Sequence, residues 1–333
     1  HTQFWLEGIV GRVLRISDAD IQQTLSAEDF VASCDEAFRL YGSGEMWNPE
    51  RREEMRREGG LDDFRLELPA EWPGRYRSRK VIEERSDVAT GRLGHRTAVI
   101  ELEDLRMGQR AVLDAGHITD MRTGAAGALG ARYLARDPVS TVAILGTGRI
   151  ARALALCADL VLRPKEVRAT SRHPANREAF EASVGPGVSA ELRMTDSVQA
   201  CVTGADVVLA AVPTPEPILM AGDVSEDTHL SVIGGDTRTA QLDLDLLCSR
   251  HVVVDHPEQA KRSGDFRRAE SLGRLHEIRL ATGDHDRVLT IGDAAMGRAG
   301  HLRGTGAIAY FTGLGVQDLA AAAAAYEGIT EVE

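Results

Sequence analysis

The chain has 333 residues, of which 43% are hydrophobic and 27% are charged, and its formal net charge is −12. This length exceeds what one hydrophobic core usually supports, so we expect a soluble globular protein with two domains. The acidic surplus argues against nucleic acid or an anionic membrane as a partner.

Hydropathy and cysteine spacing indicate the compartment. No apolar run approaches the roughly 20 residues of a membrane-spanning helix, and no signal peptide is recognised. The cysteines have neither disulfide-like nor metal-like spacing, and no histidines are paired as ligands, so we expect no metal. These features predict a cytoplasmic protein.

The first part of the chain is predicted to be a mixed α/β region. An amphipathic helix is expected at residues 27–41, and the polar stretch 45–63, rich in Arg and Glu, is typical of a loop. Candidate strands follow at residues 65–68, 79–83, 97–103 and 111–115. A helical pattern then runs from about residue 119 to residue 135, and Asp137-Pro138 ends it.

The most informative motif is a glycine turn between a short apolar strand and an alanine-rich helix, in Val142-Ala-Ile-Leu-Gly-Thr-Gly-Arg-Ile-Ala151. Gly146 permits a tight turn, and Gly148 lets the backbone approach a pyrophosphate. The N-terminus of the following helix adds free N–H groups and a positive dipole end. The motif predicts dinucleotide binding, with a plain structural turn as the alternative. The cofactor contacts expected here are Gly146, Thr147, Gly148, Arg149 and Ile150.

The end of the second predicted strand bears on which dinucleotide is bound. An acid about 20 residues after the glycine turn would bind the ribose hydroxyls of NAD. Ser171 and Arg172 occupy this strand end, and no carboxylate does. A hydroxyl and a guanidinium suit a 2′-phosphate better than a 2′-hydroxyl. The pair therefore favours NADP over NAD, unless Arg172 is an ordinary solvated residue.

Strands and helices alternate from residue 141 to about residue 291. Continuous apolar runs at residues 206–212, 229–233 and 251–255 suit strands buried on both faces of a parallel sheet. Val212, at the end of the first run, is a further candidate cofactor contact. An alanine-rich helix at residues 315–326 lies beyond the alternating region.

These elements predict an α/β fold in which a Rossmann-type, doubly wound parallel sheet is inserted in a second, discontinuous α/β domain. The dinucleotide-binding domain would comprise residues 126–304. Residues 1–125 and 305–333 would form the other domain, which would bind the substrate.

Asp236 is the leading catalytic candidate. It follows a predicted buried strand at the carboxyl edge, where open α/β sheets place ligands, and Gly234-Gly235 would let the backbone come close to a nicotinamide. A carboxylate there can take or give a proton while hydride moves to or from the nicotinamide. The alternative is an Asx turn or a helix cap, since Thr237 follows.

Several motifs occur in one order along nearly the whole chain. They are Asp114-Ala-Gly-His-Ile-Thr-Asp-Met-Arg-Thr123, Ile144-Leu-Gly-Thr-Gly148, Gly204-Ala-Asp206, Pro217-Ile-Leu219, Gly234-Gly-Asp236 and Gly313-Leu-Gly-Val-Gln-Asp318. Their order and spacing resemble the ornithine cyclodeaminase/μ-crystallin family. The resemblance implies a homodimer built through the domain that does not bind nucleotide. It also implies a small amino or imino acid bound between the domains.

The resemblance assigns roles to two cationic residues. Arg122 would hold the substrate carboxylate through two parallel hydrogen bonds, with Thr123 beside the cofactor; the alternative is a helix-start arginine in a structural salt bridge. Lys80 would bind the carboxylate near the reacting carbon and take part in catalysis. Arg79 is the alternative in the next register, because only one of the two can face the pocket.

Two further residues are assigned in the same way. Arg56 would be a second substrate-binding arginine, with Arg52 and Arg57 as neighbouring candidates and a solvated Arg/Glu face as the alternative. Glu67, which precedes Leu68-Pro69, would be a catalytic acid or base.

Three hypotheses for function follow from the family's activities. The first is an NADP-dependent imine reductase or amino-acid dehydrogenase. The second is a cyclodeaminase that holds NAD as a built-in catalyst and releases ammonia. The third is a non-catalytic binder of a small molecule. The sequence departs from the family's motifs at residues 83–87 and 239–243, which leaves the substrate open.

Overall fold

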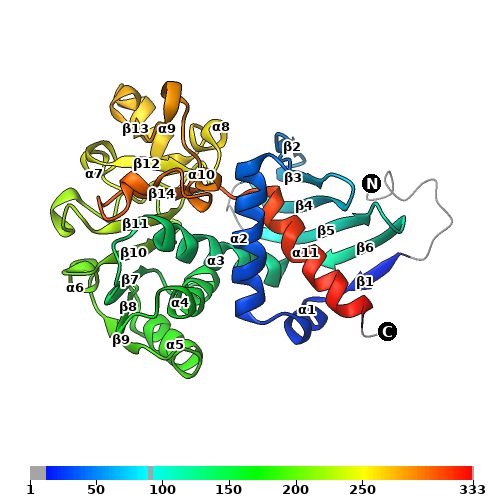
Figure 1. Cartoon of the computed structure of the whole chain (residues 1–333), viewed down its shortest axis with the longest axis horizontal. Coiled ribbons are helices and arrows are strands. Elements are labelled where there is room, and N and C mark those ends of the chain that lie inside the picture. The colour runs from blue at the N-terminus through cyan, green and yellow to red at the C-terminus, as the bar shows by residue number, and fades with distance from the viewer. Residues whose placement is uncertain (1–12, 89–92, 332–333) are drawn as a thin grey trace.

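The computed structural model describes residues 13–88 and 93–331, which form two units that each contain one sheet (Figure 1). One unit has a six-stranded, mainly antiparallel sheet, and the other has an eight-stranded parallel sheet. The last helix returns to the unit in which the chain begins, so the red and blue segments lie side by side (Figure 1). The predicted α/β class and the discontinuous arrangement are confirmed.

The six-stranded sheet is built from long hairpins. Its order is β1-β6-β5-β4-β3-β2, with β1 parallel to β6 and the other neighbours antiparallel. The strands are β1 (Leu14–Ile16), β2 (Arg52–Glu58), β3 (Leu61–Trp72), β4 (Tyr76–Asp87), β5 (Leu93–Asp104) and β6 (Gln109–Asp114).

Helices cover one face of this sheet. α1 (Asp18–Thr24) and α2 (Ala27–Ser43) both begin with a capping box, formed by Ser17 and Ser26 respectively. α11 (Gly315–Thr330) packs on β3, β4 and β5 and lies against α2. Side chains alternate along a strand, so every second residue of the central strands is buried under these helices. The other residues lie on the opposite side of the sheet, which is called the open face below.

Strand β2 corrects one prediction. Residues 45–63 were expected to form a loop, but Arg52–Glu58 pairs along its whole length with β3. All seven of its residues are exposed, so neither face carries the alternating apolar pattern that reveals a strand in a sequence. Pairing with a neighbouring strand, rather than hydrophobic burial, makes this segment extended.

The parallel sheet has the order β13-β12-β14-β11-β10-β7-β8-β9. Its strands are β7 (Thr141–Leu145), β8 (Glu166–Thr170), β9 (Glu191–Thr195), β10 (Val207–Ala210), β11 (His229–Ile233), β12 (His251–Val254), β13 (Arg279–Leu280) and β14 (Ile308–Phe311). Its helices are α3 (Gly116–Leu134), α4 (Arg149–Leu162), α5 (Pro174–Val184), α6 (Val198–Val202), α7 (Leu244–Ser249), α8 (Pro257–Ala260), α9 (Gly264–Ser271) and α10 (Ile291–Ala295). Short 3₁₀ turns lie at Gly185–Gly187, Ala221–Asp223, Leu275–Glu277, Asp284–Asp286 and Gly300–Leu302.

The strand order reverses between β7 and β10. From β7 the chain proceeds through β8 to β9 on one side, and then through β10 to β11 on the other. Open α/β sheets bind ligands at the carboxyl ends of the strands where such a reversal occurs. By this rule, the carboxyl ends of β7 and β10, where α4 begins, are the expected ligand site.

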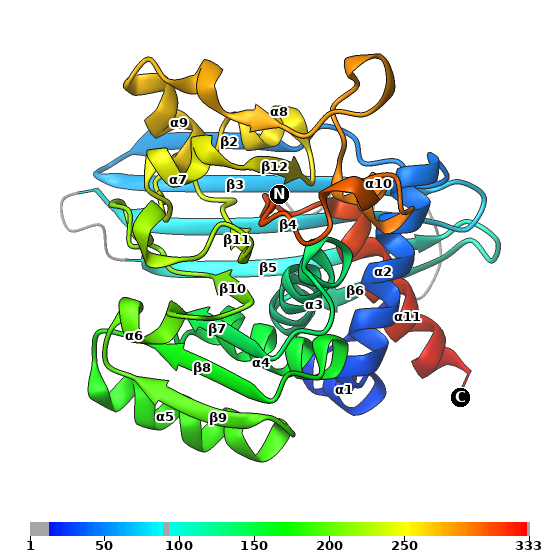
Figure 2. The same ribbon diagram turned by 60° about the vertical axis from the view of Figure 1, so that its left-hand side comes forward.

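Helix α3 joins the two units. It packs against α2 of the first unit and against α4, β11 and β14 of the second, and it lies between the two sheets (Figure 2). The helix begins at Gly116, earlier than the expected residue 119. Its alanines and glycines are buried on all sides, so its sequence shows only a weak amphipathic period.

The chain returns from the parallel-sheet unit to the first unit later than expected. β14 pairs with β11 and β12 inside the parallel sheet, so the chain leaves this sheet after Phe311 rather than near residue 305. The limits of the two domains otherwise stay a prediction.

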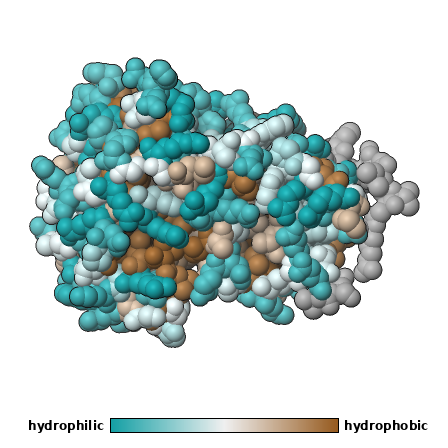
Figure 3. All heavy atoms as spheres, viewed as in Figure 1, coloured by the Kyte–Doolittle hydropathy of each residue, from teal (hydrophilic) through white to brown (hydrophobic). Residues whose placement is uncertain are grey.

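The surface is mainly hydrophilic, with a hydrophobic area over the parallel-sheet unit in the view of Figure 3. In the part of the chain that the structure describes, no helix combines the length and hydrophobicity needed to cross a bilayer. Cys34, Cys157 and Cys201 are buried and Cys248 is half-buried, and all four are free thiols.

Candidate active site

The glycine turn has a backbone that only glycine accommodates without strain. Gly146 has φ of 105°, and a Cβ added there would lie 3.0 Å from the carbonyl oxygen of Ala211. Gly148 caps α4 without a side chain, and an added Cβ would meet nothing within 4 Å. The N-terminus of α4 therefore faces open space at the switch point, as phosphate binding requires.

The residues next to this turn are partly accessible. Thr147 and Ile150 are half-buried, and Arg149 is exposed with an ion pair to Asp120 at 3.5 Å. The Thr123 hydroxyl donates to the carbonyl of Thr119 at 2.6 Å, within its own helix.

Gln241 was not predicted, yet it links the segments that follow two neighbouring strands at the carboxyl edge of the parallel sheet. Its side chain is fully buried, and its Oε1 accepts a hydrogen bond from the backbone N–H of Val212 at 2.7 Å. Its Nε2 donates to the carbonyl of Ile233 at 2.7 Å. The amide thus fixes the segments after β10 and β11 relative to each other.

The end of β8 carries cationic and hydroxyl groups. Ser171 is half-buried and Arg172 is exposed. Arg177, which was not predicted, donates from Nη1 to the carbonyl of Ser171 at 2.7 Å. The strand end therefore has two guanidinium groups close by.

Three charged side chains form a buried cluster on the face of the six-stranded sheet that the helices cover. They are Lys80 of β4, Arg122 of α3 and Asp318 of α11. The Lys80 Nζ lies 2.7 Å from Asp318 Oδ2, and Arg122 donates from Nε to Asp318 Oδ1 at 3.0 Å. The side chains of Lys80, Asp318 and Arg122 are only 2%, 1% and 8% exposed. Two cations thus share one carboxylate in a buried place.

The register of β4 decides which of the two basic residues takes part. Lys80 stands opposite Leu68 and Ile100, which are both buried under the helices. Arg79 points to the open face, where it binds Glu101 at 2.7 Å.

The burial of Lys80 alters its acidity. Desolvation and the positive charge of Arg122 both lower the pKa of Lys80, to about 8. The attraction of Asp318 raises the pKa but only partly offsets these two effects. A lysine with such a pKa can exchange a proton near neutral pH.

Arg122 is held from a second side by Gly313. A Cβ on Gly313 would lie 3.1 Å from Nη1 and 3.3 Å from Nη2 of Arg122, so the guanidinium packs on bare backbone. Asp318, like Gln241, was missed among the site residues, because a single acid in an alanine-rich helix carries no periodic signal. Its place in the motif that begins at Gly313 was the available clue.

Asp236 lies just after β11, as expected for the carboxyl edge of the sheet. It accepts hydrogen bonds from the backbone N–H of Arg238 at 2.8 Å and from Nη2 of Arg238 at 3.1 Å. Partial burial alone would raise the pKa of Asp236, but the hydrogen bonds from Arg238 hold it below its usual value. The carboxylate is 44% exposed and is therefore reachable by a ligand.

The structure does not bring Glu67 and Arg56 to this cluster. Glu67 faces the open side of the sheet, where it binds Arg65 at 2.8 Å and Arg79 at 3.5 Å. Arg56 is 82% exposed on β2 and pairs with Glu54.

Arg51, which was not predicted, is the buried arginine of this region. Its side chain is 6% exposed and pairs with Glu53 at 2.9 Å. It directly precedes β2, and with Arg52, Glu67, Pro69 and Arg79 it lines a second pocket.

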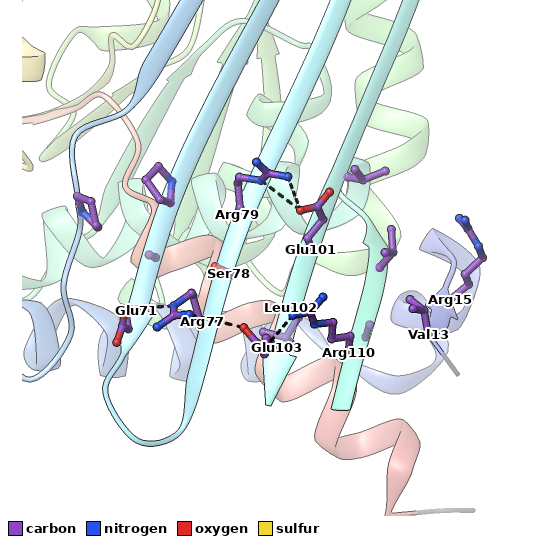
Figure 4. Close-up of a pocket in the computed structure, with 16 residues that line it drawn as sticks. Val13, Arg15, Glu71, Arg77, Ser78, Arg79, Glu101, Leu102, Glu103 and Arg110 are labelled. Carbon is purple, nitrogen blue, oxygen red and sulfur yellow. Dashed lines mark hydrogen bonds and ion pairs between the residues drawn. The ribbon is translucent and has the colours of Figure 1, made fainter. Parts of the chain in front are cut away.

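A separate pocket lies on the open face of the six-stranded sheet. Figure 4 shows Arg79 joined to Glu101, and Arg77 between Glu71 and Glu103. Pro69, Val99 and Val112 add apolar surface between these charged side chains. This pocket is on the other side of the sheet from Lys80 and is not part of the cluster.

In the described residues, no group of three or more His, Cys, Asp or Glu side chains is arranged to hold a metal ion.

An open parallel sheet with a glycine turn at its switch point, joined to a second sheet that carries a buried lysine and arginine, defines a two-unit dinucleotide-binding protein. The sequence profile of the ornithine cyclodeaminase/mu-crystallin family matches residues 13–333. The chain belongs to this family, which confirms the resemblance found in its motifs.

Named relatives include different enzymes. The chain is 30% identical over 319 residues to an alanine dehydrogenase of Archaeoglobus fulgidus, covering 94% of each chain. It is 31% identical over 172 residues to an L-lysine cyclodeaminase of Streptomyces rapamycinicus, covering 50% of each. A solved archaeal alanine dehydrogenase dimer with bound NAD matches with a TM-score of 0.78 and 28% identity, covering 96% of this chain and 97% of that one. The family therefore includes dehydrogenases and cyclodeaminases, and the solved alanine dehydrogenase contains bound NAD.

Proposed function

We propose that this protein is an NAD(P)-dependent oxidoreductase that acts at the α-carbon of a small amino or imino acid. The observation that carries the proposal is the cluster of Lys80, Asp318 and Arg122, where two buried cations share one carboxylate. Buried charges are stable only when they are balanced, so the surplus positive charge favours an anionic ligand. A substrate carboxylate supplies that charge.

Each group of residues would have a separate role in the reaction. Arg122 and Lys80 would clamp the carboxylate and so orient the α-carbon. Asp236, exposed at the sheet edge, would take or give the proton at the substrate nitrogen. Thr123 and the turn from Gly146 to Ile150 would hold the dinucleotide, whose nicotinamide supplies or accepts the hydride.

One experiment separates redox chemistry from cyclodeamination. Purified protein would be mixed with L-alanine, L-ornithine, L-lysine, L-proline or a cyclic imino acid, and both reduced cofactor and free ammonia would be followed. Net formation or consumption of reduced dinucleotide supports the proposal. If neither a change in reduced cofactor nor free ammonia is detected with any of these compounds, the proposal is wrong.

A cyclodeaminase is the second candidate, favoured by the similarity to the L-lysine cyclodeaminase. In that reaction the hydride returns to the product, so ammonia would appear from ornithine or lysine without net change in the cofactor. The same assay therefore decides between the two.

We also propose that NADP is the preferred dinucleotide. Ser171 and Arg172 at the end of β8 support this, together with Arg177 close by. A tighter dissociation constant for NADPH than for NADH, measured by fluorescence titration, is the expected result; the reverse order would refute it.

We further propose a homodimer that uses the open face of the six-stranded sheet. The similar alanine dehydrogenase is a dimer, and the face carries a pocket lined by Pro69, Val99 and paired Arg and Glu side chains (Figure 4). Sedimentation equilibrium should give twice the chain mass, and substitution of Val99 by Arg should give a monomer. A monomeric parent protein would contradict this proposal.

A further inference from the structure

Asp255 is a buried carboxylate of the parallel-sheet unit. It directly follows β12 and is fully buried. Its Oδ2 accepts hydrogen bonds from the backbone N–H groups of Thr312 and Gly313, both at 2.7 Å. Its Oδ1 accepts from the Thr312 hydroxyl at 2.7 Å and from the N–H of His256 at 2.8 Å. Three of these four bonds therefore hold one short segment.

That segment connects β14 of the parallel-sheet unit to α11, which packs on the six-stranded sheet. β14 ends at Phe311 and α11 begins at Gly315, so Thr312 and Gly313 lie in the connection. Gly313 has φ of 87°, and its backbone packs against the Arg122 guanidinium. The first turn of α11 then supplies Asp318, which binds Nε of the same arginine. Both supports of Arg122 thus come from one continuous segment, and Asp255 holds its start.

We propose that Asp255 is a positioning residue that sets Arg122 for carboxylate binding. The proposal rests on the proposed function only for the nature of the ligand that Arg122 receives. A carboxylate is suited to this place because all four of its partners are donors. An asparagine has one acceptor oxygen where the carboxylate has two. Its NH₂ group faces either the N–H of His256, while the Thr312 hydroxyl can turn toward Gln259 Oε1 at 3.0 Å and accept, or the two N–H groups of Thr312 and Gly313, so at least one N–H bond is lost in each orientation.

The first test is the variant Asp255→Asn, with L-alanine and a cyclic imino acid as probes. Displacement of Arg122 by about 1 Å should raise KM for the active probe by roughly 10- to 100-fold, with a much smaller change in kcat. The dissociation constant for NADPH should change by no more than about twofold, since the glycine turn is not supported by Asp255.

The matched control is Asp159→Asn. Asp159 is also a buried carboxylate that accepts two consecutive backbone N–H groups, from Ser189 at 2.8 Å and Ala190 at 2.9 Å, but these partners precede β9 and do not belong to the segment that supports Arg122. This variant should lose stability and keep the parent KM. An equal rise of KM in both variants would overturn the positioning role.

The second test asks whether Asp255 acts through Arg122. In an Arg122→Gln background, Asp255→Asn should add almost nothing to the rise in KM. Independent, multiplicative effects of the two substitutions would contradict the proposal.

The third test needs no substrate. The rate at which phenylglyoxal modifies Arg122, measured by peptide mass spectrometry, should rise severalfold in Asp255→Asn. If Asp255→Asn does not fold, Thr312→Val carries the test, because it removes one bond to the carboxylate and leaves both Asp255 and Gly313 in place. An unchanged labelling rate overturns the proposal, whereas faster labelling in a protein inactive on every probe would refute only the proposed function.

Discussion

Replacing Lys80 by Met should stabilise the protein and abolish its activity. The pKa of this lysine falls from 10.5 to about 8 because burial and Arg122 disfavour its charged form. A shift of this size corresponds to roughly 3 kcal/mol by which the charge opposes folding. Met keeps the aliphatic volume without the charge, but it loses the contact with Asp318, which costs about 1 to 2 kcal/mol. The net expectation is a gain of roughly 1 to 2 kcal/mol near neutral pH.

The pH dependence of this gain has a defined sign. Because the folded pKa of Lys80 lies below its unfolded value, the unfolded chain binds more protons between about 8 and 10.5, and the stability of the parent rises with pH there. The destabilising contribution is complete below about pH 8 and disappears above about pH 10.5. The advantage of Lys80→Met should therefore shrink across this window.

Urea unfolding of parent and variant, at neutral pH and near the top of this window, is the assay. Lys165→Met is the control, because Lys165 is exposed, and it should change the free energy of unfolding by less than about 0.5 kcal/mol. A Lys80→Met protein that is less stable than the parent at neutral pH, or an advantage that grows with pH, would refute the reasoning.

Three further substitutions test the site. Arg122→Gln should raise KM for the active amino or imino acid by roughly 100-fold while NADPH still binds, because it removes a charged, bidentate donor; an unchanged KM would exclude Arg122 from substrate binding. Gly148→Val should abolish dinucleotide binding in titration calorimetry with little loss of thermal stability, since a Cβ there meets nothing within 4 Å; full binding would place the phosphates elsewhere. Arg172→Ala should weaken NADPH roughly tenfold and leave NADH unchanged, and an equal loss for both would show that Arg172 does not contact a 2′-phosphate.

Local patterns predicted much of this structure. The apolar runs gave the strands of the parallel sheet because both faces of each strand are buried, and the glycine turn is where the motif indicated. Strand β2 was missed because all of its residues are exposed, so its extended form depends on a partner strand.

The candidate cluster was predicted only in part. Lys80 and Arg122 were singled out from motifs, but Asp318, their shared partner, was not. The three residues come from β4, α3 and α11, so no sequence spacing relates them. Glu67 was assigned from its place near Pro69 in the family pattern, while the register of β3 and β4 puts it opposite Val81, on the face of the sheet away from Lys80.

The strand, glycine turn and helix at the start of the parallel-sheet unit follow from local sequence, because these elements are neighbours in the chain. Which charged groups meet depends on contacts between segments that are far apart in the chain. The pairing register of β4 turned Lys80 rather than Arg79 under the helices, and the return of α11 brought Asp318 to it. Burial then lowered the pKa of Lys80, an effect that depends on the surroundings of the lysine and not on its neighbours in sequence.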